Sequence, residues 1–428
     1  MLSLALLTGA RARGHSSRAG FRRGGAPACS YEGMPSTPGW DGGELDLLTE
    51  WAVAKTANRP IVCEYNPDAA WLWSKWRGTV LSLTASPVLL NMGVGVAVDY
   101  ASRELSAASW SMLSVPPAAD PLIASLNGLN TLWEYELTLC TFILTFFTSQ
   151  AYAHWRSVYF TTRAIQGRVN DVCLLLAVGA QRGGSGYSED ASRLLQRCTR
   201  LIRVSHTFFW AATPTCSNGV GDGGVEDGDA SEDLPAELRN ARAIGPLLLS
   251  PEGLQGLVAA GELTPEEAAA LLGTGLPPSQ YTYVLMEWVG LHAMSGISDG
   301  TLRGGNGFED NLLRRLTELR AQYFNIGDYA AGRMPLAYVQ LVQVLVDSLV
   351  FLSPFALYPE LGSLSVFATG LLTLFFKGLL ELSKSFLDPF GNEGYPGQNI
   401  RVDVLVSELN FGSGSRWTKA GALLPDSH

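Results

Sequence analysis

The sequence predicts an all-α membrane protein with four transmembrane helices and a sizeable helical domain on one side of the membrane. Hydrophobic residues make up 47% of the 428 residues and charged residues only 16%, whereas soluble domains are typically about 25% charged. Four segments approach the roughly 20 apolar residues that a helix needs to span a bilayer. The bases that flank these segments all fall on one side of the expected membrane.

The four expected spans cover residues 78–98, 133–155, 335–358 and 361–384. The first carries no charge, and the second is uncharged from Leu137 to Ala153. The third contains a single acid, Asp347. A carboxylate within a span is costly unless it is paired or wetted. We therefore expect Asp347 to pair with a base or to border a water-filled vestibule, with a role in gating as the alternative.

The flanking charges predict an orientation. The two connections between spans that would lie on the opposite side are poor in bases, because residues 99–136 hold only Arg103 and residues 354–362 hold none. The positive-inside rule then places both termini on the basic side. The bases that flank the first three spans on that side are Lys75, Arg77, Arg156, Arg163, Arg168, Arg314, Arg315, Arg320 and Arg333, and Lys377 and Lys384 lie at the end of the fourth span.

The remaining chain divides into a leader, a channel domain and a tail. The first 31 residues hold five arginines and no acid, a composition typical of an organelle transit peptide. We expect residues 1–45 to be this leader, with a plain disordered segment as the alternative. The main domain covers residues 46–412, and residues 413–428 form a tail.

A glycine-rich acidic stretch at about residues 214–245 predicts a disordered insertion within the main domain. Eleven acids against two arginines between residues 220 and 270 carry nine of the ten net negative charges. The acidic balance therefore belongs to one segment, and it argues against nucleic acid as a partner.

Several segments between the second and third spans predict soluble helices. Residues 191–204 and 309–324 place apolar residues at helical spacing between charged ones. In the stretch 257–272, Gly261 can end one short helix and Thr264 can cap the next. Pro265 suits the first helical position, and Glu267 completes a capping box. This stretch predicts a soluble helical hairpin.

Enzyme chemistry finds little support in the sequence, and we expect neither catalytic residues nor a cofactor. The five histidines show no HExxH motif and no metal-ligand pair, and no P-loop, GxSxG or dinucleotide-binding glycine pattern occurs. The six cysteines are scattered without a CxxC pair, so buried thiols are expected.

The second expected span carries a stripe of three residues, Thr138, Phe142 and Phe146, each one helical turn after the last. Packing against another helix is the simplest interpretation. The alternative is that several copies surround an axis, so that the stripe lines a narrow pore that gates by dewetting. The positive edges of the phenyl rings would then face a large, weakly hydrated anion.

Five motifs together resemble the bestrophin family of anion channels. They occur in the family's order and cover roughly residues 70–410. The second of them contains the aromatic stripe, and the last ends in Asp388-Pro389-Phe390-Gly391. The motifs are "KWRGTV" (75–80), "FILTFFTSQAYAHWRSVY" (142–159), "LVAAGELTPEEAAALL" (257–272), "MPLAYVQLV" (334–342) and "FKGLLELSKSFLDPFGNE" (376–393).

The resemblance implies a homopentamer in which Thr138, Phe142 and Phe146 repeat around one axial pore as its neck. The first of these positions is usually aliphatic in the family, so threonine would admit water at one end. A second constriction would fall near residues 307–312, with Phe308 as the candidate side chain.

The resemblance also bears on calcium. Asp388 and Glu393 would be a remnant of the family's calcium site. Glu393 is the only carboxylate in the segment after Gly391 that could serve, and it cannot complete the 6 to 8 oxygen ligands that calcium prefers. We therefore expect calcium-independent gating.

The resemblance implies a bestrophin-like passive anion channel embedded in the lipid bilayer, with chloride as the expected ion and bicarbonate as the further candidate. The arginine-rich leader together with the resemblance implies the thylakoid membrane of a chloroplast, with another organelle membrane as the alternative. Two rivals stay open: a non-conducting helical membrane scaffold or assembly protein of the same fold, and a membrane enzyme that acts on a lipid or quinone.

Overall fold

The computed structural model describes residues 45–46, 49, 52–53, 61–62, 67–74, 76, 79–106, 121–183, 186–213, 247–305, 307–390 and 400–410. These residues all belong to one compact unit, residues 41–428. The predicted leader up to residue 44, the acidic insertion (214–245), Glu393 and the tail (413–428) lie outside the described residues. The same holds for the flanking bases Lys75 and Arg77.

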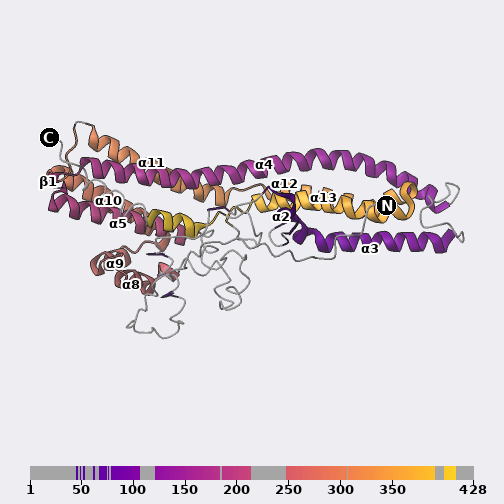
Figure 1. Cartoon of the computed structure of the whole chain (residues 1–428), viewed down its shortest axis with the longest axis horizontal. Coiled ribbons are helices and arrows are strands. Elements are labelled where there is room, and N and C mark those ends of the chain that lie inside the picture. Colours follow the sequence, from indigo (N-terminus) through magenta and orange to yellow (C-terminus); the bar gives the residue numbers. More distant parts are fainter. Residues whose placement is uncertain are drawn as a thin grey trace, which may run out of the picture. The chain divides into compact units, whose positions relative to one another are not determined.

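Four long helices form the apolar half of the described structure, and each contains most of one expected span. Helix α3 packs on α13 and α12, and the first half of α4 also packs on α12 and α13 (Figure 1). The short helix α2 (Ala69–Ser74) precedes them. The four helices are α3 (Val80–Ser106), α4 (Pro121–Gly179), α12 (Leu336–Leu361) and α13 (Ser365–Phe386).

Helix α4 differs most from expectation, because it is a single helix of 59 residues where a span over 133–155 was predicted. At a rise of 1.5 Å per residue it is about 90 Å long. Beyond Ala153 its buried residues recur at helical spacing, which keeps it packed on the helical domain. These buried residues are Val158, Ile165, Val169, Val172 and Leu176.

Two segments of the described chain are long and apolar enough to cross a membrane, Val80–Glu104 and Leu336–Phe386. The second has 51 residues because α12 and α13 follow one another through the short turn η3 (Gly362–Leu364). The uncharged stretch of α4 is less apolar, since it carries several threonines, Ser149 and Gln150. The mostly helical architecture is thus confirmed, whereas the count of four spans stays a prediction.

Close contacts and a buried amide hold the apolar helices together. A Cβ atom at Gly378 of α13 would lie 2.5 Å from Val80 Cγ1 of α3, so only glycine permits this approach. The Nδ2 atom of Asn91 in α3 donates to the Val350 carbonyl at 2.9 Å and to Thr373 Oγ1 at 2.8 Å. Asn91 thereby joins α3, α12 and α13 in a region where no lipid can satisfy its amide.

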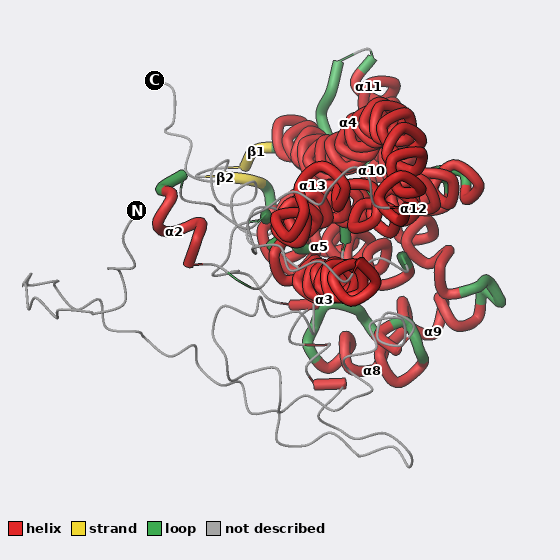
Figure 2. Tube along the Cα trace, turned by 90° about the vertical axis from the view of Figure 1, so that its right-hand side faces the viewer, coloured by secondary structure: helices red, strands yellow, loops and turns green. Residues whose placement is uncertain are grey.

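The second half of α4 shares an apolar core with the helical domain. That domain comprises α5 (Glu189–Ala212), η2 (Pro278–Gln280), α10 (Tyr281–Ser298), α11 (Phe308–Ala331) and the hairpin of α8 (Pro251–Ala259) and α9 (Pro265–Gly273). The segment 400–410 completes the core. Helices α5 and α10 lie between α4 and the hairpin (Figures 1 and 2). A small antiparallel pair, β1 (Arg182–Gly183) and β2 (Gly186–Tyr187), follows α4.

The predicted hairpin is confirmed in detail. Gly261 has a φ of 76° after α8, the left-handed conformation that favours glycine at a helix end. Pro265 opens α9. The Glu267 amide donates to Thr264 Oγ1 at 3.2 Å, and Glu267 Oε2 accepts from the Thr264 amide at 2.9 Å. The capping box is therefore complete.

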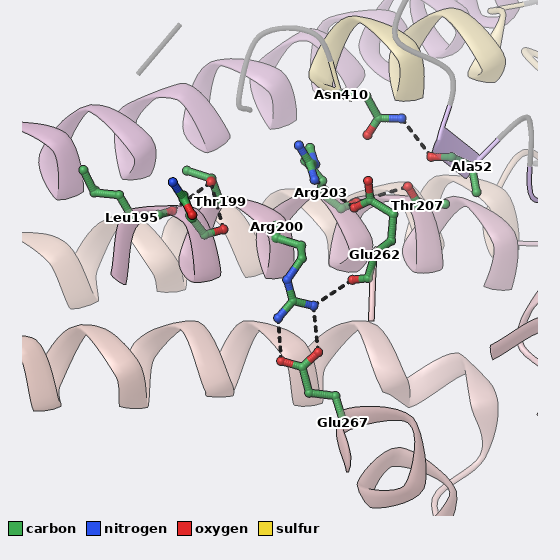
Figure 3. Close-up of polar contacts among 10 residues, drawn as sticks. Ala52, Leu195, Thr199, Arg200, Arg203, Thr207, Glu262, Glu267 and Asn410 are labelled. Atoms are coloured by element: carbon green, nitrogen blue, oxygen red, sulfur yellow. Dashed lines mark hydrogen bonds and ion pairs between the residues drawn. The ribbon is translucent and has the colours of Figure 1, made fainter. Parts of the chain in front are cut away.

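Two arginines of α5 fasten the hairpin to the domain (Figure 3). Arg200 donates from its two terminal nitrogens to both carboxylate oxygens of Glu267, at 2.7 Å each, and to the Glu262 carbonyl at 2.7 Å. Arg203 donates to the Glu262 carboxylate at 2.8 Å. Burial raises the pKa of Glu267, but the hydrogen bonds from Arg200 and the Thr264 amide, with the nearby arginine charges, outweigh it and hold that pKa below its ordinary value.

A buried histidine joins α5 to α11 within the same core. Trp210 Nε1 donates to His206 Nε2 at 3.1 Å, so Nε2 is the acceptor and Nδ1 carries the proton. His206 Nδ1 lies 2.7 Å from the Tyr323 hydroxyl. Burial lowers the pKa of His206 to about 3, although a backbone hydrogen bond with Leu405 opposes that shift. His206 is therefore neutral at physiological pH. The described cysteines, Cys140, Cys173 and Cys198, are buried free thiols as predicted.

Candidate functional site

The first half of α4 has two faces of different character. One face packs on α12 and α13, and its side chains are at most 1% exposed; they are Cys140, Leu144, Phe147 and Ala151. The opposite face is open in the single chain, where Phe142 is 73% exposed and Phe146 is 54% exposed. Two phenylalanines in this position indicate a surface that contacts lipid, another protein chain or an enclosed path.

The open face is a broad surface of α4 alone, formed by Leu137, Thr138, Thr141, Phe142, Thr145, Phe146 and Ser149. The three residues singled out in the sequence, Thr138, Phe142 and Phe146, therefore line one surface. Thr141, Thr145 and Ser149 join them, because their spacing of three or four residues puts them on the same side of the helix. We call these six residues the hydroxyl–phenyl face.

The three threonine hydroxyls of this face form hydrogen bonds within the helix. Thr138 Oγ1 donates to the Glu134 carbonyl at 3.1 Å. Thr141 Oγ1 donates to the Leu137 carbonyl and Thr145 Oγ1 to the Thr141 carbonyl, both at 2.7 Å. Because each proton is already donated, the outward side of each oxygen offers lone pairs to water. Phenyl rings and water-accepting oxygens thus lie side by side along this face.

The exposed faces of the neighbouring helices are different. On α3 the large exposed side chains include Leu89, Leu90 and Val96, and on α13 they include Phe367 and Leu371. Those faces are apolar, as contact with lipid tails requires. The hydroxyl–phenyl face is more polar, and polar residues within membrane segments usually face the interior of a bundle or a water-filled cavity.

Solved structures share this arrangement of helices. A crystal structure of a bacterial bestrophin homologue from Klebsiella pneumoniae superposes with a TM-score of 0.50 at 15% sequence identity, covering 77% of this chain and 97% of that chain. A point variant of that homologue gives a TM-score of 0.51 at 14% identity, with coverages of 77% and 97%. A crystal structure described as a membrane protein gives 0.52 at 14% identity, with coverages of 78% and 97%.

The chain has a bestrophin-like fold. No family model matches the sequence, and no curated protein matches it either. At 14–15% identity the likeness concerns the backbone arrangement alone, so the roles of individual residues depend on their own geometry.

Within the bestrophin-like fold, Asp347 of α12 is paired as expected. It forms an ion pair with Lys377 of α13, and Gln343 Nε2 donates to its two carboxylate oxygens at 2.9 Å and 2.7 Å. Lys377 lies inside α13, which continues to Phe386, so it belongs to the last part of the expected span 361–384. The ion pair explains how a lysine is tolerated there.

Phe308 lies at the start of α11, half-buried, and its ring packs against two glycines. A Cβ atom would lie 2.5 Å from the ring at Gly179 and 2.2 Å from it at Gly304. Phe308 therefore braces the end of α4. Its role as a second constriction is untested and stays a prediction.

Asp388 follows α13 and is 1% exposed. It lines a cavity of about 10 Å³ together with His154, Tyr329, Arg333 and three apolar neighbours, a space for about one water molecule. Its expected partner Glu393 lies outside the described residues. Among the residues that the structure describes, no group of three or more histidines, cysteines or carboxylates could hold a metal ion.

Sequence reasoning missed the three additional hydroxyl residues of the face. The signal was present, since Thr138, Thr141, Thr145 and Ser149 follow one another at spacings of three or four. The phenylalanines attracted attention because aromatic residues are rarer. The hydroxyl groups matter more for distinguishing a pore from a lipid contact.

Proposed function

We propose that this chain is one subunit of a passive anion channel whose conduction path is lined by α4. The observation that carries the proposal is the hydroxyl–phenyl face, which is open in one chain and more polar than the exposed faces of α3 and α13. The bestrophin-like fold agrees with it, because the sequence motifs resemble an anion-channel family.

A single face cannot enclose a path, so the proposal requires several copies around an axis. The homopentamer implied by the sequence resemblance would bring five hydroxyl–phenyl faces together. Rings of Phe142 and Phe146 would then form a hydrophobic neck that wets and dewets. Thr138 would keep the adjoining ring hydrated through the outward lone pairs of its hydroxyl.

The neck favours anions because the edges of phenyl rings carry partial positive charge. Large, weakly hydrated anions lose the least hydration free energy when they enter such a ring of phenyl groups. We propose chloride and bicarbonate as the physiological ions and the thylakoid membrane as the location, on the strength of the arginine-rich leader and the resemblance.

Two finer proposals accompany the channel. Gating is independent of calcium, because only Asp388 and Glu393 remain of the expected site; a steep micromolar calcium response in bilayer recordings with and without chelator would refute this. A second constriction lies near Phe308, whose position at the end of α4 supports it. Replacing Phe308 by alanine should then change the conductance of an otherwise intact channel.

The channel itself is tested by anion flux through the purified full chain in liposomes. Phe146→Arg should abolish chloride flux, and Phe146→Ala should raise it by widening the neck. Phe367→Ala is the control, because Phe367 is also an exposed phenylalanine, at 71% against 54% for Phe146, but lies on the apolar face of α13. Absence of flux through the assembled wild type would favour the non-conducting scaffold. A blocked axis with a lateral pocket would favour the lipid or quinone enzyme.

A further inference from the structure

The open face of α4 does not end with the hydroxyl–phenyl face. Steps of three and four residues continue from Ser149 along the same side of the helix. The exposed residues at these steps are Ala153, Arg156, Phe160, Arg163 and Gly167. The surface that lines the proposed path therefore becomes basic directly after the neck.

Arg156 is the base nearest to the neck on this surface. Its guanidinium carbon lies 5.4 Å from the centroid of the Phe160 ring, a cation–π contact that orients the side chain along the helix and keeps its charge. The ion pairs found among the described residues include Arg163 with Glu408, at 3.0 Å, but none with Arg156. Among the described residues, no carboxylate compensates the charge of Arg156, whereas Glu408 compensates that of Arg163.

The other end of the neck carries the opposite charge. Glu134 lies one turn before Thr138 on the same side of α4 and is exposed. The rise of 1.5 Å per residue separates Glu134 from Arg156 by roughly 33 Å, close to the roughly 30 Å thickness of a hydrocarbon core. The two charges therefore stand at the two mouths of the membrane path.

We propose that Arg156, repeated in every subunit, forms a ring that concentrates small monovalent anions at the basic-side mouth of the neck, while Glu134 lowers their concentration at the other mouth. This inference rests on the proposed channel function. Rings of arginine select anions in other pores by the same electrostatics. The unequal mouths make the anion current rectify, since the local ion supply differs between the two directions.

A plain interfacial anchor is the competing explanation for Arg156, because bases commonly mark the ends of membrane helices. An anchor would face the lipid headgroups. Arg156 instead shares its side of α4 with the hydroxyl–phenyl face, which is unlike the lipid-type faces of α3 and α13. An anchor would affect insertion of the protein but not the salt dependence of its current.

The test records single channels of the purified full chain in planar bilayers, in potassium chloride at about 50 mM and 1 M. Charge concentration acts over the Debye length, which falls to about 3 Å at 1 M. Arg156→Gln should lower the conductance at low salt at least twofold and reduce rectification, with little change at 1 M. Arg156→Lys should preserve both properties, and Glu134→Gln should raise the low-salt current entering from its own mouth.

Arg193→Gln is the control, because Arg193 is an exposed arginine on another helix, α5, where it pairs with Asp190. Wild-type behaviour of Arg156→Gln at both salt concentrations would overturn the inference and leave the channel proposal intact. A wild type that assembles but passes no current would overturn both. If Arg156→Gln does not assemble, the low-salt conductance and the rectification of Arg156→Lys and Glu134→Gln test the inference instead. Unchanged rectification in Glu134→Gln would refute the arrangement of opposite charges at the two mouths.

Discussion

Replacing Arg200 by glutamine should destabilise the helical domain far more than replacing the exposed Arg193. Arg200 makes three hydrogen bonds of 2.7 Å to the hairpin, two of them to the Glu267 carboxylate. The Arg200 and Glu267 side chains are only 17% and 16% exposed. Removing one partner of such a pair leaves the other charge buried, which costs about 3 kcal/mol. With about 2–4 °C of melting temperature per kcal/mol, the melting temperature should fall by roughly 6–12 °C.

The assay is thermal unfolding of the purified protein in detergent at one fixed scan rate, since membrane proteins often unfold irreversibly. Arg193→Gln removes an ion pair whose side chains are 67% and 74% exposed, so it should leave the melting temperature unchanged within error. Equal shifts in the two variants would refute the reasoning, because they would mean that burial of the Arg200 pair adds nothing.

The pH dependence of stability provides a second test of the Arg200–Glu267 ion pair. The pKa of Glu267 is held below its ordinary value of 4.5, so the pair contributes its full stability above that pH. The contribution disappears as the pH falls through the lowered pKa, because a protonated Glu267 no longer attracts Arg200. The difference between wild type and Arg200→Gln should therefore shrink below pH 4.5. A constant difference down to pH 3 would contradict the electrostatic explanation.

Two further predictions concern other contacts of the core. Gly378→Ala should destabilise the protein by about 1–3 kcal/mol, because the added methyl group overlaps Val80. Gly93→Ala is the control, because its methyl group meets no atom within 4 Å, and it should be neutral or slightly stabilising. Similar changes in the free energy of unfolding for both variants would refute the packing argument. His206 has a pKa of about 3 against an ordinary 6.5, so folding loses about 1.4 kcal/mol per pH unit as the pH falls from 6.5 toward 3. His206→Gln should remove that part of the melting-temperature slope, and an unchanged slope would show that other groups cause it.

Local signals in the sequence predicted the features that depend on neighbouring residues. The capping box of Thr264 and Glu267 spans three residues, and its geometry follows from residue type and spacing alone. The stripe of Thr138, Phe142 and Phe146 likewise follows from helical periodicity. Such features need no knowledge of the rest of the fold.

Features that depend on distant partners could not be predicted in the same way. The sequence predicted a base as the partner of Asp347 but could not identify Lys377, which lies 30 residues later, across the turn between two helices. The continuation of α4 past His154 was hidden because its pattern changes from uncharged to charged and amphipathic where the helix leaves the apolar bundle. In the sequence, a helix that passes from an apolar bundle into a soluble domain looks like a helix that ends, because the uncharged pattern stops in both cases.

The unbroken length of α4 also has a mechanical consequence. One stiff helix carries both the neck residues and the surface that packs on the helical domain, without a proline between Pro121 and Gly179. It therefore acts as a lever. A tilt of about 5° at Val178 would move Phe146 by about 4 Å, over the roughly 48 Å of helix between them. In the proposed channel, a molecule that binds the helical domain would in this way change the width of the pore neck without touching it.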